Sequence, residues 1–185
     1  YSKHITVRDN QVRHGRTHGM LLRNLYDSRI EGNVVQSSKD GFFFSGCYQD
    51  TLQANWISAN DVGIQVSDSK DNLLVANAFI ENANQLVYEG YSHVVWEGGD
   101  EGGNYWSDYV GWDRDGDGIG DKRHYPSDIA SYLVGRFPAV RLVLHSPAML
   151  LLQGLESQFP VMRPPGVMEA QPLMRAPIGL SGSPQ

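Results

Sequence analysis

The hydrophobic positions between residues 18 and 90 repeat with a period of 22 residues. Segments 19–22, 41–44 and 63–66 each begin with glycine and carry apolar side chains two residues apart. Alternation over short runs is the periodicity of β-strands, and no apolar stripe of helical spacing crosses this region. A unit of about 22 residues holds three short strands and three turns, which is one coil of a parallel β-helix.

Two columns of the repeat support this interpretation. Asn33, Asn55 and Asn77 share one offset, and carboxamides stacked on one another between adjacent coils supply the donors and acceptors that a buried turn needs. The glycine column is predicted to mark turns that need a positive φ or a close approach of two backbones. We therefore predict an all-β parallel β-helix with coils of 22 to 23 residues, a C-terminal cap and a short amphipathic helical tail. A two-sheet sandwich of similar strands is the alternative.

The repeat also extends toward the N-terminus. Residues 7–12 match residues 30–35 at an offset of 23, so the chain is predicted to be the C-terminal part of a longer protein. After Gln85 the period breaks, and three large aromatic side chains within residues 103–109 are predicted to close the open end of the solenoid. The chain is therefore predicted to contain three regions. Residues 1–110 form the coils and the cap, residues 111–125 form an acidic loop, and residues 126–185 form a helical and proline-rich docking tail.

Composition narrows the function classes. The 185 residues are 41% hydrophobic with a formal net charge of -6, which indicates a folded domain and argues against nucleic acid as the main partner. The single cysteine, Cys47, is interpreted as a buried thiol, with metal ligation as the alternative. The sequence contains no run of 18 apolar residues. The carboxylates of the coils lie mainly near turns and form no evident acid and base pair, so no enzyme activity is predicted.

The strongest chemical motif is the acidic segment 113–121. It places carboxylates at loop positions 1, 3, 5 and 9 with glycine at position 6, a spacing that surrounds a hard cation with oxygen atoms. Position 12 is His124 instead of glutamate, so an EF-hand helix pair is not implied. We predict a structural calcium site, with an acidic turn that holds no ion as the alternative. The predicted ligands are Asp113, Asp115, Asp117 and Asp121, together with the backbone carbonyl of Ile119.

A second candidate metal site lies in the turn before the second coil. His14 and His18 are four residues apart and Met20 follows, and imidazole and thioether groups both suit copper. The glycine-rich sequence favours a solvated turn as the alternative. Met20 also occupies the inward column of Phe42 and Ile64, which favours a packing role.

The tail contains two predicted helices. The first covers residues 127–133, and the second is capped by Ser146, has Pro147 at its first position and stops at Pro160. The apolar face of the second helix is predicted to be covered by another surface. The alternatives are the open end of the solenoid, a partner protein and a membrane surface. The arm after it is predicted to be extended and mostly uncovered. The predicted docking residues are Leu151, Leu152, Leu155, Phe159, Met162 and Met168.

The segment Gly-Asn-Tyr-Trp-Ser-Asp-Tyr at 103–109, with the acidic loop after it, resembles the C-terminal signature of NosD-type β-helix proteins. Segments 145–148, 158–161, 164–167 and 172–174 resemble the tail of the NosD family, the maturation factors of nitrous oxide reductase. This resemblance implies a right-handed β-helix in the periplasm that assists assembly of the reductase's copper centres. It implies copper as a transferred metal. The implied partners are the membrane subunit of an ABC transporter, a copper chaperone and nitrous oxide reductase.

Hypotheses of different classes remain open. The first is the periplasmic accessory protein for copper delivery that the resemblance implies. The alternative is a secreted β-helix protein that binds or modifies carbohydrate, and a surface-layer module is a third. The tail favours the first, because neither alternative has an evident use for an exposed apolar helix and arm.

Overall fold

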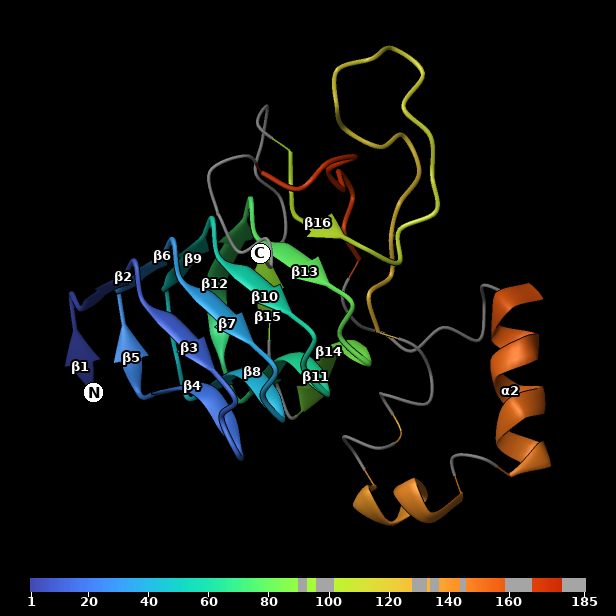
Figure 1. The fold of residues 1–185 in the computed structure, drawn as a ribbon, viewed down its shortest axis with the longest axis horizontal. Helices are drawn as coiled ribbons and strands as arrows, with labels where there is room; N and C mark the ends of the chain where they lie inside the picture. The colour runs from blue at the N-terminus through green and yellow to red at the C-terminus, as the bar shows by residue number, and fades with distance from the viewer. Residues whose placement is uncertain are drawn as a thin grey trace.

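The computed structural model describes residues 1–89, 93–95, 102–127, 133, 137–143, 146–158 and 168–177. Its body is a stack of β-coils with very little helix (Figure 1). All the paired strands named in the described coils are parallel to their neighbours in adjacent coils. This arrangement confirms the predicted parallel β-helix and excludes the two-sheet sandwich.

Three sheets form the walls of the coils. The first sheet contains β2 (Thr6–Arg8), β6 (Arg29–Glu31), β9 (Thr51–Gln53), β12 (Lys70–Val75) and β15 (His93–Val95). The second contains β3 (Gln11–Arg13), β7 (Val34–Gln36), β10 (Trp56–Ser58), β13 (Ala78–Ile80) and β16 (Tyr105–Trp106). The third contains β4 (His18–Arg23), β8 (Asp40–Ser45), β11 (Val62–Ser67) and β14 (Asn84–Glu89), and a short pair joins β1 (Ser2–Lys3) to β5 (Leu25–Tyr26).

The 22-residue period sets the register between coils. Phe42 lies opposite Ile64, Ile64 lies opposite Leu86, and Leu52 lies opposite Leu74. Because these residues alternate with outward ones along each strand, they stack in columns inside the solenoid. Each of them is almost completely buried, and burial of one such side chain contributes roughly 1.5–3 kcal/mol to the free energy of folding.

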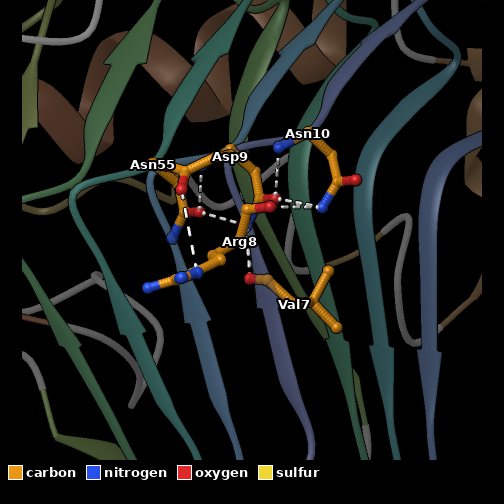
Figure 2. Close-up of polar contacts among 6 residues, drawn as sticks. Val7, Arg8, Asp9, Asn10 and Asn55 are labelled. Carbon is orange, nitrogen blue, oxygen red and sulfur yellow. Dashed lines mark hydrogen bonds and ion pairs between the residues drawn. The ribbon is translucent and has the colours of Figure 1, made fainter.

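An asparagine ladder runs along one inner corner of the coils. Its members are Asn10, Asn33, Asn55, Asn77 and Asn104. In each step the Nδ2 atom of one asparagine donates to Oδ1 of the next at 2.8 or 2.9 Å. The same Oδ1 accepts the backbone N–H of the earlier asparagine at 3.0 or 3.1 Å. Figure 2 shows the start of the ladder around Asn10 and Asn55, and the stacked column predicted from the sequence is confirmed.

The residues that directly precede the ladder asparagines Asn55 and Asn77 have a left-handed backbone conformation. Ala54 and Ala76 have φ angles of 50° and 53°, and each directly precedes a ladder asparagine. A left-handed residue other than glycine costs roughly 1–2 kcal/mol. The neighbouring coil offsets this cost, because Ala54 N donates to Val75 O at 3.3 Å and the corner asparagine is fully bonded. Alanine has no local preference for this conformation, so the coil-to-coil bonds impose it.

The glycines of the repeat lie inside strands and not at the predicted turns. Gly19, Gly41 and Gly63 are the second residues of β4, β8 and β11 and have no positive φ, so the predicted turn position is wrong. The predicted close approach is confirmed. A Cβ on Gly41 would lie 2.5 Å from the carbonyl oxygen of Gly63 and 2.8 Å from Cγ2 of Ile57.

Cys47 is a core residue, as interpreted from the sequence. Its side chain is completely buried, and its Sγ atom lies 3.5 Å from the carbonyl oxygen of Leu22. Burial raises the pKa of the thiol to about 11. A neutral, enclosed thiol packs the core and is a poor metal ligand, because metals bind the thiolate.

The last coil continues beyond the point where the sequence period breaks. Strands β14 and β15 confirm the two late strands predicted around residues 87 and 94. Asn77 and Asn104 are 27 residues apart rather than 22, so the coil carries an insertion. On β16, Trp106 stacks on Phe79 with ring centroids 4.3 Å apart and is 1% exposed, so one of the three predicted cap aromatics is buried at the end of the core.

Residues 168–177, called the strap from here on, return to the cap and cover its end. Leu173 forms a parallel bridge with Tyr105 and an antiparallel bridge with Ile119. The Leu173 N–H donates to the Asn104 carbonyl at 2.9 Å, the bond that a further coil would make. Figure 1 shows this red segment beside β16. The prediction of an uncovered arm is therefore wrong for the strap.

Helix α2 (Pro147–Gln158) confirms the second predicted tail helix. The Met149 N–H donates to Ser146 Oγ at 3.3 Å, which is the predicted N-cap. A 3-10 helix, η2 (Pro138–Val143), precedes it and was not predicted. Most of the first predicted helix, residues 127–133, lies outside the described residues.

Helix α2 stands apart from the coils (Figure 1). The strap covers the end of the solenoid, so that end does not cover α2.

Replacing Asn55 with alanine should lower the free energy of unfolding by at least about 3 kcal/mol. The change leaves buried groups of Asn33, Asn77 and the Ile30 carbonyl without their partners. Denaturant unfolding of Asn55→Ala measures the loss, with Gln53→Ala on the outer face of the same coil as the control. If Asn55→Ala and Gln53→Ala lowered the free energy of unfolding equally, the structural role of the ladder would be contradicted.

Candidate functional site

The ladder ends at a buried carboxylate of the strap. Asn104 donates to Glu169 Oε2 through Nδ2 at 2.9 Å and through its backbone N–H at 3.2 Å. Glu169 is 0% exposed, and a Cβ on Gly103 would collide with its Oε1 atom. Burial raises the pKa of Glu169 to about 7, although the bonds from Asn104 act in the opposite direction. The cap therefore holds a titratable acid in the position of the next asparagine.

The contact between Asn104 and Glu169 was not predicted from the sequence. Asn104 precedes Tyr105-Trp106 as Asn77 precedes Ala78-Phe79, so comparison of the two segments could have found it. Glu169 carried no comparable signal, because it lies 65 residues from Asn104 in a segment without periodicity.

His124 lies beside this closure, between two aromatic rings. Its ring centroid is 5.5 Å from that of Trp106 and 5.6 Å from that of Tyr109. Its backbone exchanges two hydrogen bonds of 2.9 Å with Glu169, so the strap fixes its position. The Nε2 atom of His124 lies 3.5 Å from Oδ1 of Asp108. Burial by itself raises the pKa of Asp108, but the contact with His124, a backbone hydrogen bond and the bond from Gln85 together leave the pKa lowered.

A polar cavity of about 220 Å³ opens in front of Asp108. It lies between the β13–β14 corner and the segment that follows His124. Its lining among the described residues is Asn82, Ala83, Asn84, Gln85, Asp108, Tyr125 and Pro126. Gln85 Nε2 donates to Asp108 Oδ1 at 3.2 Å, so the carboxylate is held at the cavity wall.

The structure gathers three of the predicted calcium ligands. Carboxylate oxygens of Asp113, Asp115 and Asp117 lie within 4.8 Å of one another. Backbone N–H groups of Gly118 and Gly116 donate to Asp113 at 2.9 and 2.7 Å, and these bonds lower its pKa. Asp121 lies outside this group of carboxylates, and the predicted backbone carbonyl of Ile119 stays a prediction.

Asp121 Oδ2 accepts the backbone N–H of Arg114 at 2.8 Å, which closes the loop across its base. The Ile119 N–H donates to Asp117 Oδ1 at 2.8 Å, and the residue bridges to Leu173 of the strap. The acidic loop is thus tied to the cap. Its calcium assignment stays a prediction.

The three predicted copper ligands of the first turn occupy different environments. His14 is exposed at a left-handed corner, and Met20 packs against the apolar core, as its column position predicted. His18 Nδ1 lies 2.8 Å from Asp40 Oδ2, without the alignment of a hydrogen bond, and its ring contacts Phe43. No contact described in the structure joins the three side chains, and the copper assignment to them stays a prediction.

Two comparisons place the chain among known proteins. The model of the family described as "Periplasmic copper-binding protein (NosD)" matches residues 1–111. The chain belongs to the NosD family. It is 35% identical over 192 residues to the "Probable ABC transporter binding protein NosD" of Pseudomonas aeruginosa, and 33% identical over 193 residues to the protein of that name from Stutzerimonas stutzeri.

Each NosD alignment covers 95% of this chain but only 44% of the relative, so the chain spans less than half the length of these curated relatives. The family description confirms the predicted periplasmic location and copper as the family's metal. The family description and the name of these relatives refer to binding proteins and state no catalytic activity. Within the described residues, no helix is both long and apolar enough to cross a membrane.

Raising the pH from 4.5 to above 7 should weaken the cap. Folded Glu169 has the higher pKa, so the stability that its proton provides is complete below pH 4.5 and is lost as the pH rises through about 7. Glu169→Gln mimics the protonated acid and should remove up to about 3 kcal/mol of this dependence of the free energy of unfolding. Denaturant unfolding of both proteins at pH 4.5, 6 and 8 measures the difference. If the free energy of unfolding of the two proteins changed with pH in the same way, Glu169 would have the same pKa in the folded and unfolded chain, which would contradict the prediction.

Proposed function

We propose that this chain is part of a periplasmic accessory protein that helps to assemble the copper centres of nitrous oxide reductase together with an ABC transporter. Membership of the NosD family and the names of two relatives support this function. In this role the β-helix receives copper from a chaperone and presents it to the reductase. The tail docks the assembly to the membrane subunit of the transporter.

The exposed face of α2 is the observation that carries the docking proposal. Leu151 is 69% exposed and Leu155 is 42% exposed, and Leu150 beside them is also exposed. Met149 is buried, so the helix has one covered side and one apolar side without cover among the described residues. An apolar helical face of this kind is typical of a surface that a partner protein covers. Phe159 and Met162 lie outside the described residues, and half-buried Met168 belongs to the strap.

A structural calcium ion is the second part of the proposal. Three carboxylates whose oxygens lie within 4.8 Å repel one another, and a hard divalent cation removes that repulsion. Gly118, at loop position 6, has a φ of 88°, the left-handed conformation that the sharp turn of such a loop needs. Because Ile119 bridges to the strap, an ion in the loop would stiffen the cap rather than take part in copper transfer.

Charged substitutions on α2 should block maturation of the reductase. Leu151→Glu combined with Leu155→Glu places two carboxylates on the docking face, and the copper content of reductase purified from cells carrying this variant should fall by roughly tenfold. Val110→Glu, on an apolar residue of the cap that is 80% exposed, is the control and should support normal loading. Normal copper loading with the double variant would contradict docking through α2.

Calcium should raise the unfolding temperature of the full chain by several degrees, because it binds only the folded loop. Asp115→Asn removes one carboxylate and alters its contacts with Asp117 N at 3.4 Å and with the side chain of Asp113, and it should abolish this response. Asp61→Asn, an exposed carboxylate of the coils, should leave the response intact. Thermal unfolding with calcium or a chelator measures the effect, and equal responses of all three proteins would argue against the loop site.

A further inference from the structure

We propose that the outer face of β4 and β8 is a docking surface for a partner protein that presents an acidic patch. This surface, called the basic face from here on, has two apolar residues at its centre and three cations around them. They are Leu21 and Phe43, and Arg16, Arg23 and Lys39. The proposal rests on the proposed function, in which the coils meet other proteins, and it assigns such a contact to named residues.

An apolar pair lies on the outside of the sheet. Leu21 and Phe43 are directly opposite each other in β4 and β8, and they alternate with the inward core residues of these strands. Leu21 is 52% exposed and Phe43 is half-buried. Gln65 of β11, the next residue in the same column, is polar. The accessible apolar surface of this column is therefore centred on β4 and β8.

The three exposed cations lie at the two ends of these strands. Arg23 is the last residue of β4, and its guanidinium lies 5.9 Å from the centroid of the Phe43 ring. Arg16 and Lys39 lie at the corner that leads into the two strands, where Lys39 N donates to Gly15 O at 3.3 Å. An apolar centre with arginine and a charged rim is typical of surfaces that bind another protein.

These cations have no acidic partner in the part of the chain that the structure describes. The described ion pairs involve other residues. Asp40, the carboxylate of β8, is buried and lies 2.8 Å from His18 Nδ1. Asp61, exposed at the same corner of the next coil, forms no described ion pair with Lys39. The positive charge of the basic face is thus available to a partner.

The distribution of charge favours a protein as that partner. Residues 1–29 contain six lysine and arginine residues and two aspartates, whereas the whole chain has a formal net charge of -6. A bilayer or a nucleic acid is a continuous anionic surface, so it would also meet the acidic remainder of the chain, which repels it. A compact group of carboxylates on a protein can contact the basic face alone.

The basic face and α2 can be occupied at the same time. Strand β4 is at the opposite edge of its sheet from β14, and Figure 1 shows it on the far side of the coils from α2. A protein that docks on the basic face therefore leaves the exposed face of α2 free for the transporter.

The test measures binding of the full chain to purified nitrous oxide reductase and to the purified copper chaperone. At least one of them should bind at about 50 mM salt, and its affinity should fall at least about tenfold at about 300 mM salt. Arg16→Glu combined with Arg23→Glu, the basic-face variant, should lower the affinity at least about tenfold at low salt. Leu21→Ser should lower it roughly fivefold without changing the salt dependence.

The matched control is Arg8→Glu combined with Arg29→Glu. It makes the same change in net charge at exposed positions of β2 and β6, and it should leave the affinity within about twofold of the unchanged chain. Every altered side chain is exposed, so all variants should keep the unfolding temperature of the unchanged chain.

Equal losses of affinity in the basic-face variant and its control would overturn the proposal, because net charge alone would then drive binding. Binding of neither protein would also overturn it, and vesicles of phosphatidylglycerol and phosphatidylethanolamine then show whether the face binds a membrane instead. If the reductase binds the basic-face variant normally while the α2 variant still blocks its copper loading, the basic face is wrong and the accessory function stands.

Discussion

The hydrogen bonds from Asn104 to the buried carboxylate of Glu169 close the asparagine ladder. Every carboxamide in the ladder needs an acceptor on the coil that follows it, and the last coil has no successor. The strap supplies that acceptor from 65 residues farther along the chain. It adds the backbone bond from Leu173 N to Asn104 O that a true coil would make. The end of the solenoid is thus sealed, and the tail is attached to it.

This closure organises the chemistry of the cap. The two backbone bonds between Glu169 and His124 set the imidazole against Trp106, with Nε2 facing Asp108. The bridge from Leu173 to Ile119 ties the acidic loop to the same strap. The strap thus holds the cap, the histidine and the acidic loop together at one end of the coils.

Much of the fold could be predicted from the sequence because a solenoid repeats its local rules. The 22-residue offset fixes which residues of adjacent coils face each other, so the asparagine column and the inward apolar columns followed directly. The left-handed corners did not, since Ala54 adopts its φ only through bonds to the next coil. Glu169 and the pairing of His124 with Asp108 depend on contacts between segments that share no repeat, and periodicity says nothing about such contacts.

Photo-crosslinking from α2 tests the central claim, that the exposed helix docks this NosD-family chain onto its transporter. A photoreactive amino acid at Leu151 is activated in intact cells and the products are identified by mass spectrometry, with the same probe at Val110 as reference. The account predicts crosslinks from Leu151 to the membrane subunit of the ABC transporter, and none to that subunit from Val110. Crosslinks from Leu151 to lipid alone, or equal crosslinks from both positions, would contradict it.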